Sequence, residues 1–416
     1  MIEELLLKAK NCVSTTYDLT TEKKNTALKY MAEELLLDCD YILEENKKDL
    51  ESAAHLSSVM KDRLRLTKER IISIKDGILK VAELPDPTNR VLAEKHSDNG
   101  LIIKKISVPF GVVAVIFESR PNVSADTAAL TLKSGNVCIL RCSKDSLLSC
   151  KAIVKSLKKG LIKAGLSEDL INIVDDRSRE SATRLMTANG YVDLLIPRGG
   201  AGLIKACVEN STVPCIETGT GICHVYVDEF ADLNKALKIV ENAKTSRPSV
   251  CNAEEVLIVH EKVANEFLPK LKKLLVDDRT KNGLIPVELK LCEKSIKIID
   301  GTPAKKEDFE TEFLDYILAV KIVENIGEAI NQIKLNSTKH SDAIITENEV
   351  NSNLFISSID SAAVYVNAST RFTDGGEFGN GAEIGISTQK LHARGPMGLN
   401  ELNTYKYVII GNGQIR

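Results

Sequence analysis

Short apolar runs alternate with segments of helical pattern through residues 111–217, and this alternation constrains the fold more than any other feature of the sequence. The runs read GVVAVIF, NVCILR, INIVD, VDLLIP and TVPCIE. Strands that are apolar throughout and joined by helices form parallel sheets covered on both faces. The segment therefore predicts a five-stranded parallel sheet, in which ligands bind beyond the carboxyl ends of the strands.

The flanking segments predict further parts of the fold. Apolar residues recur at helical spacing from residue 1 to about 84, and the prolines of LPDPTN end that pattern. Residues 90–108 predict a hairpin, because a DNG turn signal separates two strand-like runs. A second alternation begins near residue 246 and predicts a second α/β domain; its strand-like runs are EEVLIVH, YILAVKIV, SDAIIT and SAAVYVN.

Composition excludes several classes of protein. The chain of 416 residues has 55 lysines and arginines against 58 acidic residues, a formal net charge of −3, which argues against a polybasic nucleic-acid or membrane-surface binder. Apolar runs are shorter than the roughly 18 residues that span a bilayer, and the start lacks a basic signal-peptide region. We therefore expect a cytoplasmic protein with no membrane or nucleic-acid partner. The ten cysteines form no C-x-x-C pair and no zinc-ligand pattern, so we expect no metal.

One cysteine lies in surroundings that differ from an apolar run. Cys251 lies in SRPSVCNAEE, a polar loop directly before a predicted strand, with Arg247 four residues upstream. A nearby cation favours the thiolate, which is the nucleophilic form of cysteine. The alternative is an unreactive loop thiol, and spacing alone does not separate the two.

Two glycine-bearing turns are candidate ligand sites. ETGTG places Glu217 and Gly219 after the last run of the first domain, where a carboxylate suits acid/base work or a cofactor contact. PRGGAG places Gly199, Gly200 and Gly202 in a strand-to-helix turn, where backbone N–H groups favour phosphate. Taken alone, ETGTG is better explained by a strand-end turn with a solvated glutamate, PRGGAG is a weak signal because tight glycine turns are common, and no G-x-G-x-x-G follows the first run.

Polar side chains follow the first two predicted strands. ESRPNV supplies Arg120 and Asn122, and LRCSKDS supplies Arg141 and Lys144. Each cation alone is explained by solvation, but three at one sheet edge favour a phosphate-bearing ligand. A long Gly-rich segment, 367–398, adds further charged residues without metal-ligand spacing: Arg371, Glu383, His392 and Arg394.

Together these motifs, in this order, resemble the gamma-glutamyl phosphate reductases, or glutamate-5-semialdehyde dehydrogenases, of the aldehyde dehydrogenase superfamily. The resemblance runs from about residue 5 to the closing GNGQIR. In that superfamily a glutamate lies some 34 residues before the nucleophilic cysteine, and Glu217 and Cys251 have that separation. The resemblance therefore implies that Cys251 is the nucleophile.

The resemblance also implies a fold and its division into domains. It implies an aldehyde dehydrogenase-like α/β fold with a Rossmann-like cofactor domain, an α/β catalytic domain and a small oligomerisation arm. The expected ranges are 1–89 with 109–245 for the cofactor domain, 246–390 for the catalytic domain, and 90–108 with 391–416 for the arm. A homo-oligomer, at least a dimer, follows, and contact with the upstream glutamate kinase is a further expectation.

The implied reaction is the NADPH-dependent reduction of L-glutamyl 5-phosphate to L-glutamate 5-semialdehyde and phosphate, the second step from glutamate to proline. Cys251 forms a thioester, and the Asn122 amide is the expected oxyanion partner. Glu217 is expected to position the cofactor or Cys251, because water activation would waste the acyl phosphate. The expected rivals are a hydrolytic, NAD-dependent aldehyde dehydrogenase and a non-catalytic binding protein of the same fold.

The resemblance assigns cofactor and substrate contacts as well. Arg141 falls where relatives carry a ribose-binding lysine, and Lys144 replaces a glutamate of NAD-preferring relatives, which suits a 2′-phosphate. The Gly199–Gly202 turn, Glu217 and Gly219 are the other expected cofactor contacts. The expected substrate contacts are Arg120, Arg247, Arg371, Glu383 and Arg394.

Overall fold

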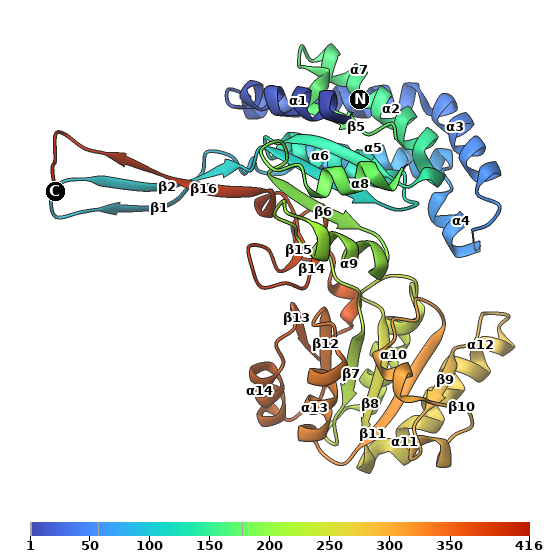
Figure 1. The fold of residues 1–416 in the computed structure, drawn as a ribbon. Helices are drawn as coiled ribbons and strands as arrows, with labels where there is room; N and C mark the ends of the chain where they lie inside the picture. Colours follow the sequence, from blue (N-terminus) through green and yellow to red (C-terminus); the bar gives the residue numbers. More distant parts are fainter. Residues whose placement is uncertain (1, 57, 177) are drawn as a thin grey trace. The chain divides into compact units, whose positions relative to one another are not determined.

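The computed structural model describes residues 2–56, 58–176 and 178–416, which form two compact units (Figure 1). The first unit comprises residues up to Thr218 together with Gly379–Gly385 and Pro396–Arg416. The second comprises Gly219–Phe378 and Ile386–Gly395. Each unit has its own sheet and its own buried core, so the two are described separately.

The first unit is built on a parallel sheet, as the alternation of runs predicts, but the sheet has four strands where five were expected. Its spatial order is β5 (Ile171–Ile173), β4 (Val137–Cys142), β3 (Val112–Phe117) and β6 (Leu194–Arg198). Every residue of β3 is buried, because helices cover the sheet. Since all four strands are parallel, their carboxyl ends meet at one edge.

Helices surround this sheet, and their ends follow ordinary capping chemistry. The side chain of Thr20 accepts a hydrogen bond from the Lys23 N–H at the start of α2, and Thr67 does the same for Arg70 at the start of α5. The helices of this unit are α1 (Ile2–Cys12), α2 (Thr21–Leu37), α3 (Cys39–Ser52), α4 (Ser58–Leu64), α5 (Lys68–Glu83), α6 (Asn122–Lys133), α7 (Leu147–Lys163), α8 (Arg179–Met186) and α9 (Ala201–Asn210). The prediction of helices up to residue 84 is confirmed.

The expected fifth strand at 212–217 does not form. The segment meets the sheet at one isolated bridge between Cys215 and Leu195. The Leu195 N–H bonds the Pro214 carbonyl, and the Ile216 N–H bonds the Leu195 carbonyl. Pro214 has no N–H of its own, so the ladder cannot continue through it. Glu217 therefore follows a bridge and not a strand end.

Three antiparallel strands form an arm on the first unit. The hairpin of β1 (Val91–His96) and β2 (Ile102–Pro109) is confirmed, and β16 (Asn403–Ile410) pairs with the other edge of β2. Figure 1 shows the arm reaching away from the helices of its own unit. All six residues of β1 are exposed, as are the apolar side chains of Tyr407 and Ile409 on β16.

The second unit is built on a seven-stranded sheet whose described pairings are all parallel. Its order is β10 (Thr302–Pro303), β9 (Glu288–Leu291), β11 (Ile317–Val323), β8 (Glu254–His260), β7 (Cys223–Val227), β12 (Ser341–Ile345) and β13 (Ala363–Val366). Strand β8 is buried along its whole length, and one apolar cluster packs on each face of the sheet. The parallel α/β architecture expected for this region is confirmed.

From residue 219 onward the structure also describes five α-helices and one small sheet. The helices are α10 (Leu233–Thr245), α11 (Glu261–Lys272), α12 (Asp278–Lys281), α13 (Ile326–Asn336) and α14 (Glu349–Ser358). Two short strands, β14 (Gly385–Ser387) and β15 (Gly395–Met397), form a separate two-stranded sheet.

The boundary between the two units lies earlier in the chain than the domain boundary expected from the sequence. The division falls after Thr218, whereas the expected boundary between cofactor and catalytic domains was 245/246. The reason is β7, which pairs with β8 and β12 in the centre of the second sheet and brings α10 with it. Of the expected arm segment 391–416, only the part from Pro396 belongs to the first unit.

Candidate active site

The loop that carries Cys251 lies at the amino edge of the second sheet. It connects the end of α10 at Thr245 to the start of β8 at Glu254. Its two ends are joined by a fully buried ion pair, in which Lys244 Nζ lies 2.6 Å from Glu255 Oε2. Burial raises the pKa of Glu255 to about 7, against the lowering effect of Lys244. The loop is thus held at both ends by elements of the core.

Cys251 itself is a partly exposed thiol. All ten cysteines are free, seven of them are buried, and the partly exposed ones are Cys215, Cys251 and Cys292. Burial raises the pKa of Cys215 to about 12 and makes it a poor nucleophile. Cys251 is accessible to solvent, and its loop carries the positive charge of Arg247. A nucleophilic cysteine needs both solvent access and a nearby cation that favours the thiolate.

The backbone leading into β7 packs directly against Cys251. A Cβ on Gly221 would lie 1.4 Å from the Cys251 carbonyl oxygen, so only glycine fits there. The Cys223 thiol donates to the same carbonyl at 3.2 Å, and the Gly221 N–H donates to Glu312 Oε1 at 2.7 Å. The second glycine of ETGTG is therefore explained by this close approach. Gly219 packs against Thr388, where a Cβ would lie 2.5 Å from the hydroxyl oxygen.

Arg371 is hydrogen-bonded to the Cys251 loop, since its Nη1 donates to Asn252 Oδ1 and its Nε donates to the Ser246 hydroxyl at 3.0 Å. Burial and the neighbouring Arg247 lower the pKa of Arg371, and the charges of Cys251 and Asp374 raise it. Arg247 is exposed and acts on Arg371 through its like charge. A guanidinium stays protonated in proteins, so this half-buried group is a fixed positive charge at the loop that carries Cys251.

Arg394 is engaged elsewhere. Its Nη1 lies 2.8 Å from Asp360 Oδ1, and its Nη2 donates to the Asp360 carbonyl at 2.6 Å. Hydrogen bonds from Lys390 and Arg394 lower the pKa of Asp360 to about 2. These bonds join Arg394 to the residues that follow α14. Arg371 is therefore the stronger candidate for a substrate anion.

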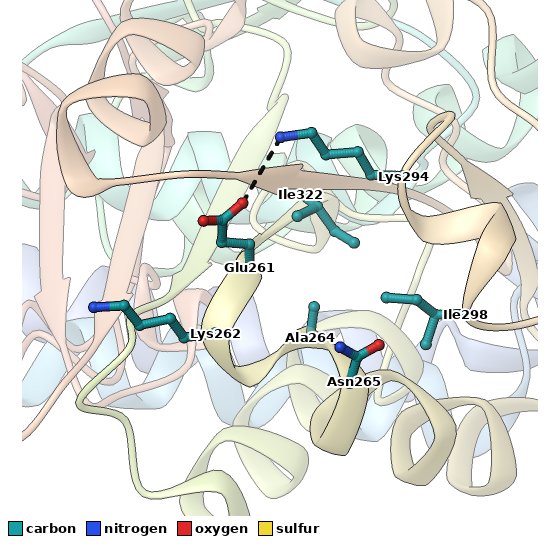
Figure 2. Close-up of a pocket in the computed structure, with 7 residues that line it drawn as sticks. All are labelled: Glu261, Lys262, Ala264, Asn265, Lys294, Ile298 and Ile322. Atoms are coloured by element: carbon teal, nitrogen blue, oxygen red, sulfur yellow. Dashed lines mark ion pairs between the residues drawn. The ribbon is translucent and has the colours of Figure 1, made fainter.

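A hollow in this unit is lined by residues of α11 and of the segments near β9 and β11 (Figure 2). Its volume is about 360 Å³, and its lining residues are Glu261, Lys262, Ala264, Asn265, Lys294, Ile298 and Ile322. It lies beyond the carboxyl end of β8, whereas Cys251 precedes the amino end of that strand. Both lysines are paired, Lys294 with Glu324 at 2.8 Å and Lys262 with Glu229 at 2.5 Å. This hollow is separate from the Cys251 loop.

In the first unit the predicted residues gather at the carboxyl edge of the sheet. Arg120 and Asn122 follow β3, and Arg141 and Lys144 lie at the end of β4 and just beyond it. The Arg141 Nη2 donates to the Ser178 carbonyl at 2.8 Å, while its buried Nε has no partner among the described residues. Lys144 is exposed. Two cations at this edge, one with an unsatisfied donor, fit a phosphate-bearing ligand.

Asn122 has a partner that the sequence analysis missed. Its Nδ2 donates to Asp126 Oδ2 at 2.9 Å, one turn along α6. Desolvation raises the pKa of Asp126 to about 6, against the lowering effects of Asn122 and Arg198. The spacing of four residues on a helix was a usable signal for this pair. Arg198, at the end of β6, was also missed.

The Gly-rich turn after β6 is already occupied by a side chain. The Gly200 N–H donates to Glu118 Oε2 at 2.9 Å, and a Cβ on Gly199 would lie 2.6 Å from the same oxygen. Gly202 lies in the first turn of α9, where a Cβ meets no atom within 4 Å. A phosphate at this turn has to displace the Glu118 carboxylate, so Gly199 and Gly200 are weaker candidates than Arg141 and Lys144.

The remaining predicted residues divide between the units. Glu217 and Glu383 belong to the first unit and are partly exposed. Thr218, next to Glu217, has its hydroxyl bonded to the Pro197 carbonyl. Within the described residues no group of three or more metal-type ligands occurs, and no helix there is long and apolar enough to cross a membrane.

Comparison with known proteins gives matches along the whole chain. Residues 13–286 match the model of the aldehyde dehydrogenase family. The gamma-glutamyl phosphate reductase of Streptococcus gordonii is 57% identical over 416 residues, covering 100% of this chain and 98% of the relative. That of Streptococcus suis is 58% identical over 399 residues, covering 95% of each. The crystal structure of gamma-glutamyl phosphate reductase from Thermotoga maritima has a TM-score of 0.95 at 45% identity, covering 100% of this chain and 99% of that one.

Proposed function

The chain belongs to the aldehyde dehydrogenase family and, within it, to the gamma-glutamyl phosphate reductases, and we propose that its reaction runs through the thiol of Cys251 with NADPH as reductant. It is an oxidoreductase of the proline pathway, which reduces L-glutamyl 5-phosphate to L-glutamate 5-semialdehyde and releases phosphate. The observation that carries the proposal for Cys251 is its partly exposed thiol in a loop whose Ser246 and Asn252 bind the half-buried Arg371 guanidinium.

The first chemical step is an acyl transfer to sulfur. The Cys251 thiolate attacks the acyl carbon, the new C–S bond forms, and the C–O bond to phosphate breaks with its electron pair leaving on phosphate. We assign to the Arg371 guanidinium the roles of favouring the thiolate and attracting the anionic substrate, because it is hydrogen-bonded to the Cys251 loop. The thioester that remains on Cys251 is the species to be reduced.

The second step releases the aldehyde from Cys251. When bound, the nicotinamide cofactor supplies the hydride for reduction of the thioester carbon. Negative charge then develops on oxygen, and we assign its stabilisation to the Asn122 amide. That amide nitrogen carries two hydrogens, so its bond to Asp126 orients the group without using both donors. Cleavage of the C–S bond returns the sulfur as a thiolate.

Glu217 is proposed as a positioning group for the cofactor or for Cys251. Its neighbour Thr218 is bonded to the Pro197 carbonyl, which restrains the turn that carries the carboxylate. A water-activating glutamate would hydrolyse the thioester and lose the acyl phosphate. We therefore assign no water activation to Glu217.

The choice of NADPH over NADH is proposed from charge. A nicotinamide cofactor is common to the family, and the phosphate of NADPH distinguishes it from NADH at the ribose 2′ position. The exposed Lys144 and the unsatisfied Nε of Arg141 lie at the carboxyl edge of the first sheet, where such a ribose binds in open α/β sheets. Cations favour the 2′-phosphate, and the chain has no carboxylate at position 144.

Self-association is proposed from the arm. Strand β1 is exposed along its length, and an exposed edge strand with apolar neighbours readily pairs with another chain. We propose a homo-oligomer, at least a dimer, that works in the cytoplasm and receives substrate from glutamate kinase. Light scattering on the wild type and on an Ile409→Asp variant tests the first point.

The reverse reaction gives the sharpest test of the function. Glutamate semialdehyde and NADP are supplied with varied phosphate, and NADPH formation is followed. We expect formation to require phosphate and to vanish in Cys251→Ala, while Cys292→Ala, a partly exposed thiol of the same unit, keeps wild-type activity. Phosphate-independent oxidation would favour a hydrolytic aldehyde dehydrogenase, and full activity of Cys251→Ala would overturn the assignment of the nucleophile.

A further inference from the structure

Asn252, the residue directly after Cys251, is bonded on every side. Its side chain is 5% exposed. Its Nδ2 donates to the Thr373 carbonyl at 2.9 Å and to the Arg371 carbonyl at 3.3 Å, and its Oδ1 accepts from Arg371 Nη1. The Asn252 carbonyl in turn accepts from the Thr370 hydroxyl at 2.7 Å. One residue therefore fixes both the backbone and the guanidinium of the 370–373 segment.

The guanidinium of Arg371 is held from two positions of the Cys251 loop. Besides the bond to Asn252, its Nε donates to the Ser246 hydroxyl at 3.0 Å. These two partners lie on either side of Cys251 in the sequence. The planar fork of a guanidinium loses little freedom when two of its donors are bound, so its charge stays at one place.

The titratable and charged groups around Cys223 and the Cys251 loop do not duplicate this charge. The Cys223 thiol donates to the Cys251 carbonyl, and burial foremost raises the pKa of Cys223 well above its ordinary value. Burial lowers the pKa of His340, 3.8 Å from Cys223, to about 4, so that imidazole is neutral at pH 7. Glu312, bonded to the Gly221 N–H, and Asp374 add negative charge, and Arg247 is exposed.

We propose that Asn252 is a positioning residue of the reaction, whose carboxamide holds the Arg371 guanidinium beside the Cys251 thiol so that the thiolate forms at neutral pH. The inference rests on the proposed function for the role of Cys251 and adds the residue that places the charge. Asn252 touches neither substrate nor cofactor in this account and acts through Arg371.

The test follows the thiol itself and needs no turnover. The full-length protein, without substrate or cofactor, is treated with iodoacetamide from pH 5 to 10, and alkylation of the Cys251 peptide is measured by mass spectrometry. We expect the pH midpoint to rise by about one unit in Arg371→Ala and by roughly half a unit to one unit in Asn252→Ala. Asn351→Ala, which removes another amide hydrogen-bonded in this unit, to Asp228, is the matched control and leaves the midpoint unchanged.

A double-mutant cycle separates positioning from a merely structural role. If Asn252 acts through Arg371, adding Asn252→Ala to Arg371→Ala leaves the midpoint of the single Arg371 variant unchanged. A shift equal to the sum of the two single shifts, or an unchanged midpoint in Asn252→Ala, overturns the proposal.

A second variant keeps the proposal falsifiable if Asn252→Ala does not fold. Asn252→Gln retains the amide but displaces it by one methylene, and we expect a smaller shift in the same direction. An unchanged midpoint in a folded Asn252→Gln protein counts against positioning. Failure of the reductase assay with intact midpoint shifts would instead count against the proposed function alone.

Discussion

The two sheets present their candidate residues at opposite edges. In the first unit, Arg120, Asn122 and Lys144 follow the strands and meet at the carboxyl edge. In the second, Gly221 and Cys251 precede β7 and β8, so they lie at the amino edge. The rule that ligands bind beyond carboxyl strand ends therefore finds the first group and would miss the second.

The difference has a chemical cause. A carboxyl edge offers loops and helix N-termini, which suit phosphates and extended ligands. At the amino edge of the second sheet the Cys251 loop is restrained at two places. The Lys244–Glu255 ion pair joins its two ends, and Asn252 within the loop is hydrogen-bonded to the Thr373 carbonyl. Restraints of this kind suit a catalytic side chain, here the Cys251 thiol, whose reacting atom has to be held in one position.

The largest expected effect tests the amino edge. In Gly221→Ala the new methyl group would overlap the Cys251 carbonyl, so the loop must shift. We expect a loss of about 3 kcal/mol or more in the free energy of unfolding and at least a hundredfold loss of turnover. Urea denaturation and NADPH oxidation measure these quantities.

The matched control is Gly77→Ala in α5, where a Cβ meets no atom within 4 Å. There the change should be neutral or stabilising by up to about 1 kcal/mol, because alanine favours a helix over glycine. Equal effects at the two glycines would show that the close approach at Gly221 is unimportant.

The next effect tests the carboxyl edge through pH. The pKa of Asp126 is raised to about 6, chiefly by desolvation, so between pH 4 and 6 the folded state holds a proton that the unfolded chain has released. Stability from this group therefore falls as pH rises through that window, by roughly 2 kcal/mol. Asp126→Asn should remove this fall, as measured by urea denaturation at a series of pH values.

The exposed Asp300→Asn is the control, because that side chain is almost fully solvated. It should reproduce the wild-type pH dependence. A wild-type slope retained in Asp126→Asn would mean that another group titrates in this window.

A third prediction concerns the cofactor. Lys144→Glu places a carboxylate at the end of β4, where it repels a 2′-phosphate. We expect the ratio of kcat/KM for NADPH over NADH to fall about tenfold, or roughly 1.4 kcal/mol. Lys205→Glu, the same charge change on the exposed face of α9, is the control. An unchanged ratio in Lys144→Glu would exclude Lys144 from the cofactor site.

The smallest effect is expected at Arg394. Its guanidinium is paired with Asp360 near the surface, so Arg394→Ala should cost less than about 1 kcal/mol of stability. We expect the KM for the acyl phosphate to change less than threefold, because the guanidinium is already bonded to Asp360. A tenfold rise in KM would restore Arg394 as a substrate contact.

The sequence predicted the elements well wherever the pattern was local. The apolar run of β3, the hairpin of β1 and β2 and the N-terminal helices depend on neighbouring residues, and all were found. The segment 212–217 has the composition of a strand, but Pro214 limits it to one bridge. Residues 223–227, which form β7, fell within the expected cofactor domain but join the second sheet, because the sheet that a strand joins depends on distant partners.

The candidate site, like the fold, has features that can be read along the sequence and contacts between distant residues that cannot. Cys251 was predicted from its loop and, through the resemblance to the superfamily, from its spacing to Glu217, both of which are read along the sequence. Its bonds to residues more than a hundred positions away were not predictable, as the pair of Asn252 and Arg371 shows. The Glu118 carboxylate at the Gly200 N–H was missed for the same reason.

The arm has a consequence for biosynthesis on the ribosome. Strand β2 emerges at residues 102–109, but its second partner, β16, is translated only at 403–410, after the whole second unit. At about 5–20 residues per second, the nascent hairpin waits roughly 15–60 s with one edge unfilled. Ribosome-bound chaperones that shield open strand edges should therefore matter more for this chain than for one whose sheets close in order.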